Sequence, residues 1–117
     1  MISTSREFVA AVRSDVIDAN LQYYQQMFTT GNAVMATDPY GKEALLFYAS
    51  LDATGRQRLF KIIRQVMADT ISSVLGILDG ATNLGQGSGA LVLELAGRSL
   101  SGTLQDEFLE MEEHESE

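Results

Sequence analysis

The stretch that decides the fold is residues 52–80, DATGRQRLFKIIRQVMADTISSVLGILDG. Asp52 or Thr54 can accept a hydrogen bond from a free amide at a helix start, and Gly80 can adopt the left-handed conformation that ends a helix. Between these positions, the apolar residues recur at helical spacing. We therefore predict one long helix over about residues 52–79 and expect it to form the centre of the fold.

The first half of this predicted helix has a basic side and an apolar side. Arg58, Lys61 and Arg64 project to the same side when successive residues are placed about 100° apart. Three cations on one face could bind a carboxylate or a phosphate, and the alternative is a solvated face that pairs with acidic side chains of the same chain. The opposite side is a broad apolar arc, made of Leu59, Ile62, Ile63, Val66, Met67, Thr70, Val74, Ile77 and Leu78.

The second half of the helix carries small residues where the first half carries cations. Ala68, Ser72 and Gly76 form this stripe, and Asp69 and Leu75 lie beside it. Small residues four positions apart let another element approach closely. We expect the stripe to be covered either by another part of the chain or by a second copy, and we take these five residues as the candidate partner interface.

Shorter patterns predict the remaining elements. A capping box at Thr4 and Glu7 starts a helix that continues to about residue 28. Its predicted apolar stripe is Phe8, Val12, Val16, Tyr23 and Met27. Asp38 and Pro39 start a shorter helix that ends near residue 51. Residues 91–95 and 99–103 have the character of two short strands, and Thr103 can cap a last helix.

These elements predict a mainly α fold. We expect a three-helix core around the long central helix of residues 52–79, followed by a small C-terminal β-hairpin and a short acidic terminal helix. A chain of 117 residues is long enough for one domain with its own core. We assign residues 1–105 to a single globular helical domain that includes the hairpin, and residues 106–117 to an acidic C-terminal segment.

The negative charge of the chain is concentrated at its C-terminal end. Residues 106–117 hold seven of the sixteen acidic residues and no Lys or Arg, so the rest of the chain is nearly neutral within a net charge of −8. The candidate contacts for a basic partner are Asp106, Glu107, Glu110 and Glu113, and the alternative is a solvated tail. Because these acids repel phosphates, we expect no nucleic-acid ligand.

The composition argues against several kinds of chemistry. The chain has no cysteine, and His114 is its only histidine, so a structural zinc site has no ligand set. The glycines of residues 85–89 are not followed by the helix that a phosphate-binding loop needs, and we interpret them as a connector. We expect no metal and no cofactor. We also expect a cytoplasmic protein that does not enter a membrane, because no apolar run approaches roughly 18–20 residues and residues 1–5 do not resemble a secretory signal.

Three functions remain open from the residues alone. Because no nucleophile, metal or cofactor constellation is visible, the leading hypothesis is a non-enzymatic binding or regulatory protein that acts through a protein–protein surface as a homodimer. In bulk character the chain resembles small bacterial accessory proteins, including immunity proteins. This resemblance implies the first alternative, an inhibitor that neutralises a basic toxin through its acidic end. The second alternative is a small-ligand binder or enzyme with a groove near Asp69, lined by Tyr23, Tyr24 and Tyr48.

Overall fold

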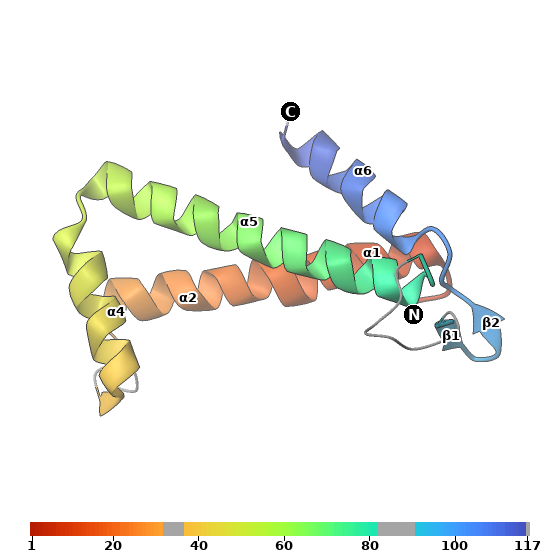
Figure 1. Ribbon diagram of the computed structural model, residues 1–117, viewed down its shortest axis with the longest axis horizontal. Helices are drawn as coiled ribbons and strands as arrows, with labels where there is room; N and C mark the ends of the chain where they lie inside the picture. The colour runs from red at the N-terminus through yellow and green to blue at the C-terminus, as the bar shows by residue number, and fades with distance from the viewer. Residues whose placement is uncertain (32–36, 82–90, 117) are drawn as a thin grey trace.

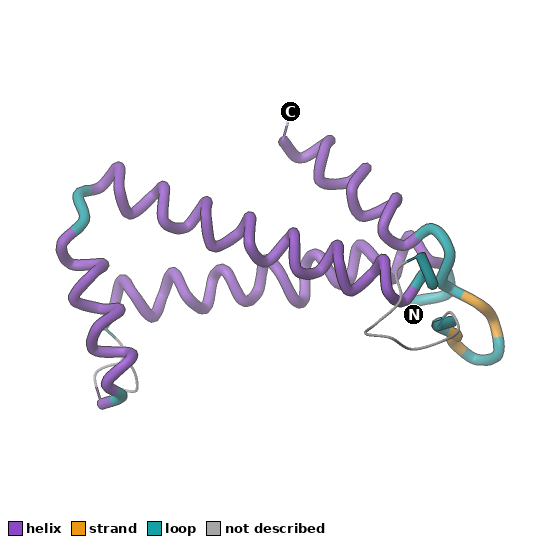
Figure 2. Tube along the Cα trace, in the orientation of Figure 1, coloured by secondary structure: helices purple, strands orange, loops and turns teal. Residues whose placement is uncertain are grey.

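Two long helical segments run antiparallel to each other along the molecule (Figure 1). This computed structural model describes residues 1–31, 37–81 and 91–116. One segment joins the first three helices without a break, the other is α5, α4 lies across one end of the pair, and a short hairpin precedes α6 (Figure 2). The elements are α1 (Ser5–Val12), the π-helical η1 (Arg13–Asp18), α2 (Ala19–Thr30), α4 (Pro39–Ser50), α5 (Ala53–Leu78), β1 (Glu94–Leu95), β2 (Arg98–Ser99) and α6 (Leu104–Ser116).

Side-chain caps start three of the helices where the sequence predicts them. Thr4 accepts a hydrogen bond from the Glu7 amide at 3.1 Å, and Asp52 accepts one from the Gly55 amide at 2.7 Å. Asp38 accepts one from the Tyr40 amide at 3.3 Å. These bonds satisfy amides that have no partner within the first turn of a helix. The predicted starts of α1, α4 and α5 are therefore confirmed.

The hydrophobic core lies where α6 packs on α1, η1 and α5. It consists of Val9, Ile17, Ala68, Leu75, Leu104 and Phe108. The mainly α fold, the hairpin and the terminal helix are confirmed. The third helix of the core, however, is α6 and not the predicted helix of residues 38–51, whose only buried residue is Gly41. The boundary that we predicted at residue 106, between the globular domain and the acidic segment, falls inside α6. Phe108, two residues later, belongs to the core.

The π-helical segment changes which residues of the first helix face the core. A π-helix places more residues in each turn than an α-helix, so it shifts the residues that follow it around the helix axis. Ile17 is completely buried, whereas the predicted core residues Val16 and Tyr23 are 39% and 54% exposed. The predicted stripe is therefore wrong at Val16, which lies inside η1, and at Tyr23 in α2, whereas Met27 is half-buried.

The hairpin is shorter than the sequence suggests. Glu94 pairs with Ser99 and Leu95 pairs with Arg98, across a turn in which Ala96 and Gly97 both have positive φ. Two central residues with positive φ are typical of the tight hairpin turn whose twist matches that of the strands. The predicted strand residues 91–93 and 100–103 lie outside this ladder, and Leu100 instead is buried. The predicted connector at residues 85–89 lies outside the described residues.

The shape of the molecule is elongated, with extents of 48 × 35 × 25 Å. Its radius of gyration is 17.5 Å, compared with about 13–14 Å for a compact domain of this length. The core lies at the end that carries α1 and α6, and α4 spans the opposite end (Figure 1). The end that contains α4 therefore keeps apolar side chains, such as those of Tyr40 and Phe47, that remain largely exposed.

Candidate functional site

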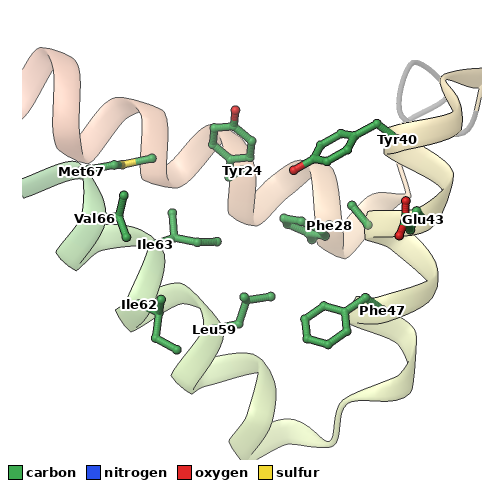
Figure 3. Close-up of a pocket in the computed structure, with 11 residues that line it drawn as sticks. Tyr24, Phe28, Tyr40, Glu43, Phe47, Leu59, Ile62, Ile63, Val66 and Met67 are labelled. Atoms are coloured by element: carbon green, nitrogen blue, oxygen red, sulfur yellow. The ribbon is translucent and has the colours of Figure 1, made fainter. Parts of the chain in front are cut away.

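The main candidate site is an apolar groove between α2, α4 and α5, with a volume of about 530 Å³. Figure 3 shows the ring of Phe47 extending from α4 toward Leu59 of α5, and the ring of Tyr40 extending from α4 toward Tyr24 of α2. One charged residue, Glu43, lies among the lining residues. The groove is lined by Tyr24, Phe28, Tyr40, Glu43, Ala44, Phe47, Leu59, Ile62, Ile63, Val66 and Met67.

A cluster of aromatic rings holds the three walls of the groove together. Phe28 of α2 lies 5.1 Å from Tyr48 of α4 and 6.1 Å from Phe60 of α5, measured between ring centroids. These separations are typical of attractive ring pairs. The guanidinium of Arg56 lies 4.5 Å from the centroid of the Tyr48 ring and donates a hydrogen bond to the Tyr48 carbonyl. The cluster therefore fixes α4 across the ends of α2 and α5.

The groove exists because α4 crosses α5 and does not lie along its apolar arc. Ile62 and Val66 of that arc are 60% and 59% exposed, and Val74 further along is 45% exposed. Tyr40 and Phe47 on the facing helix are 76% and 55% exposed. The apolar arc of α5 is therefore exposed at Ile62, Val66 and Val74. Periodicity identified the apolar side of the helix, but it could not show whether the chain covers it.

The small-residue stripe of α5 is covered by α6 of the same chain. The Gln105 side-chain amide donates hydrogen bonds to the carbonyl and the hydroxyl of Ser72, at 3.0 and 3.3 Å. A Cβ on Gly76 would lie only 3.0 Å from the Gln105 amide nitrogen, so a larger residue would require the Gln105 side chain to shift. Ala68, Leu75 and Gly76 are already buried, so a partner interface at these three residues is wrong.

Asp69 lies at the edge of a second, more polar hollow of about 510 Å³ between α5 and α6. Its side chain is exposed and accepts a hydrogen bond from the Gln65 amide at 2.9 Å. The tyrosines expected beside it are elsewhere, since Tyr24 lines the apolar groove and Tyr48 belongs to the aromatic cluster. The site predicted from Asp69 and the tyrosines is therefore not assembled.

The basic face of α5 is divided by its contacts. Arg64 forms a two-pronged ion pair with Glu112 of α6, with nitrogen–oxygen distances of 2.8 and 3.0 Å. Arg58 and Lys61 are exposed and form no ion pair with another residue that the structure describes. Of the three cations on the predicted anion-binding face, Arg58 and Lys61 are therefore exposed, whereas Arg64 joins α5 to α6.

The predicted contacts for a basic partner lie on α6, and two of them are used within the chain. Glu107 accepts hydrogen bonds from the hydroxyls of Ser5 at 2.8 Å and Thr103 at 2.7 Å. Glu110 pairs with Arg6 at 3.4 Å. Asp106 and Glu113 are exposed. The acidic segment is therefore a packed helix, with a smaller free negative surface than its composition suggests.

Glu112 is the centre of an ion-pair cluster that joins three helices. In addition to the bonds from Arg64, it accepts a hydrogen bond from the Arg13 Nε at 3.0 Å, and both arginines also contact Glu115. The side chains of Glu112 and Arg13 are each 18% exposed. The hydrogen bonds from Arg64 hold the pKa of Glu112 below its usual 4.5, although partial burial opposes them, and the charges of Arg64 and Arg13 lower it further. The hydrogen bond to Glu112 likewise raises the pKa of Arg64.

This cluster predicts an acid-dependent loss of stability. Because the folded pKa of Glu112 is lowered, its charge stabilises the fold above about pH 4.5, and that stabilisation is lost as the pH falls through the folded pKa. The raised pKa of Arg64 has its effect at alkaline pH and keeps this arginine charged throughout the acid range. We expect Glu112→Gln to lower the free energy of unfolding at neutral pH by about 1–2 kcal/mol and to flatten its decline in acid. Urea unfolding between pH 3 and 7 checks this.

Glu113→Gln is the matched control for that measurement. It removes the same charge from the neighbouring position, where the carboxylate is exposed and forms no ion pair with a described residue. We expect its free energy of unfolding to depend on pH in the same way as that of the unmodified protein. Equal losses in the two variants would mean that the net charge of α6, and not the cluster, controls the pH dependence.

Comparisons with other proteins give no family for this chain. No protein-family model matches it, and no curated protein and no solved structure matches it. In the described ranges, no group of three or more His, Cys, Asp or Glu side chains is arranged to hold a metal ion. Of the helices that the structure describes, none is long and apolar enough to cross a membrane.

Proposed function

We propose that this chain is a non-enzymatic binding protein that acts through the apolar groove between α2, α4 and α5. The observation that carries the proposal is the set of large apolar side chains left exposed around this groove, from Tyr40 at 76% to Tyr24 at 40%. Monomeric soluble proteins seldom expose a continuous apolar surface larger than a few hundred Å² unless something binds there. The groove takes the place of the small-residue stripe as the proposed interface.

The lining of the groove suits a protein partner. It combines aromatic rings with branched aliphatic side chains and one carboxylate, Glu43. Aromatic side chains are enriched at protein interfaces because they bury a large area at a low cost in conformational entropy. The three helices around the groove are fixed by the aromatic cluster, so the surface is formed before the partner arrives.

The two alternatives have less support. An inhibitor that acts through the acidic end would rely on Asp106 and Glu113, because Glu107 and Glu110 already bond to Ser5 and Arg6. A ligand site at Asp69 would use an exposed carboxylate that is bonded to Gln65, in a hollow that also contains the exposed Glu113. The other charged residues of that hollow, Arg64 and Glu112, are paired with each other. Neither arrangement gathers as many exposed apolar side chains as the groove does.

Site-specific photo-crosslinking tests the proposed surface. Benzoylphenylalanine in place of Phe47 puts a reactive aromatic group on the groove, where the native ring is 55% exposed. The matched control replaces Tyr23, which is equally exposed at 54% but does not line the groove. We expect irradiation in cells to give a discrete crosslinked protein, identified by mass spectrometry, from position 47 and not from position 23. If position 47 gives no crosslink, or the same products as position 23, the proposal is wrong.

A further inference from the structure

We propose that the occupant of the apolar groove is a second copy of this chain, in a two-fold symmetric dimer whose grooves face each other. This inference rests on the proposed function of the groove and adds the identity of the partner. Three features of the described residues carry it: the area of the apolar surface, the shape of α4 beside the groove, and the distribution of charge.

The exposed apolar surface is large enough to supply more than half of what one subunit contributes to a stable dimer. Five lining side chains, Tyr24, Tyr40, Phe47, Ile62 and Val66, are 40–76% exposed. Since a large side chain presents on the order of 150–250 Å² when bare, they leave roughly 500 Å² uncovered. A standard interface takes about 800 Å² from each partner, so this apolar surface supplies more than half of that area.

The surface has both a hollow and a projecting edge, as a two-fold contact requires. In a two-fold dimer the same patch occurs on both subunits and must fit itself. The groove supplies the hollow, and the rings of Tyr40 and Phe47 on α4, which are 76% and 55% exposed, supply the edge. Two antiparallel helices bury their shared apolar side fully when a second helical pair packs on them. Facing grooves would supply that second pair and complete the sparse packing at the α4 end.

The charges around the groove favour two copies facing each other. Glu43 lines the groove on α4. Arg58 lies on α5 one turn before Ile62, where the basic side of the helix borders the apolar arc. Both are exposed, and neither forms an ion pair within the described part of the chain. A two-fold arrangement that places α5 of one copy over α4 of the other brings Arg58 toward Glu43 of the second copy. The acidic α6 contacts α5 through Arg64, Ser72 and Gly76, a side of α5 other than that of the groove, so the two acidic helices stay apart.

Sedimentation equilibrium of single variants tests the dimer. We expect the unmodified protein to have twice the mass of one 12.8 kDa chain and to dissociate on dilution. Val66→Lys should weaken association by about 100-fold or more, because it places a charge in the apolar interface. Val74→Lys is the matched control, since it makes the same change on the same helix at an exposed residue outside the groove, and it should remain dimeric. Circular dichroism should show equal helix content in all three proteins.

The outcomes separate this inference from the proposed function. A single-chain mass for the unmodified protein at every concentration would overturn the second copy as occupant, and so would a Val66→Lys variant that dimerises as strongly as Val74→Lys. In either case, a crosslink from position 47 to a different protein would leave the groove as a binding surface. A crosslink of the chain to itself at position 47, together with the loss of dimer in Val66→Lys, supports both.

Discussion

Replacing Phe108 with alanine is expected to destabilise the protein by about 3–5 kcal/mol, the largest effect of any single substitution considered for this chain. Phe108 is 1% exposed and is one of the six residues of the core, where it packs with side chains from the N-terminal helix and α5. Truncation removes a whole ring from a core with few other members, so little neighbouring material can fill the cavity. Urea unfolding at fixed protein concentration measures the loss.

Leu109→Ala is the control for Phe108→Ala, because Leu109 is the next residue of α6 and is 44% exposed. It should cost less than about 1 kcal/mol. If Phe108→Ala does not fold, Phe108→Leu keeps most of the volume and should lose about 1–2 kcal/mol. A loss below about 1 kcal/mol in Phe108→Ala itself would show that α6 does not form part of the core.

Asp79→Ala is expected to cost about 2–3 kcal/mol, although Asp79 lies outside the core and forms no ion pair with a residue that the structure describes. Its carboxylate, at the end of α5, accepts hydrogen bonds from the backbone amides of Gly102 at 2.6 Å, Leu104 at 3.0 Å and Gln105 at 2.9 Å. Two of these amides belong to the first turn of α6 and have no partner within the helix. Asp79 therefore caps a helix that begins more than twenty residues later in the chain.

Thermal or urea unfolding of Asp79→Ala, Asp79→Asn and Asp69→Ala checks this role. Asparagine keeps one side-chain oxygen and should lose about half as much stability as alanine. Asp69 lies on the same helix, is exposed and contacts the Gln65 side chain, so Asp69→Ala should change the free energy of unfolding by less than about 0.5 kcal/mol. Equal effects at positions 79 and 69 would mean that Asp79 contributes only its charge.

The features that could be predicted correctly from the sequence are those set by residues close together in the chain, such as helix starts. Caps at Thr4, Asp38 and Asp52 are local hydrogen bonds, so a reader of the sequence can place the starts of three helices correctly. The mainly α fold follows from them. Thr103 was the local candidate for the α6 cap, but its hydroxyl donates to Glu107 and the amides are bonded by Asp79. Because Asp79 comes from another helix, the residues next to the start of α6 contain no pattern that identifies it as the cap.

The candidate site could be predicted only in part, because burial depends on how helices cross. The apolar arc on α5 was visible from periodicity, but Ile62 and Val66 are exposed only because α4 crosses the end of α5. The π-helical turn at Arg13–Asp18 also has no signature that periodicity could reveal, and it moved the buried position from Val16 to Ile17. Tyr40 and Phe47 were missed as site residues because α4 was expected to contribute to the core.

The contacts between α6 and the N-terminal helix have a consequence for how the chain folds as it is synthesised. Ser5 bonds to Glu107 and Arg13 to Glu112, so these pairs join residues 102 and 99 positions apart. Every contact of this kind requires a long loop to close before it stabilises anything. Val9 and Ile17 leave the ribosome before their partners Leu104 and Phe108, which follow them by more than 80 residues. Until then the first helix has an apolar side without cover, and the molecule completes its fold only after nearly all of these residues have emerged.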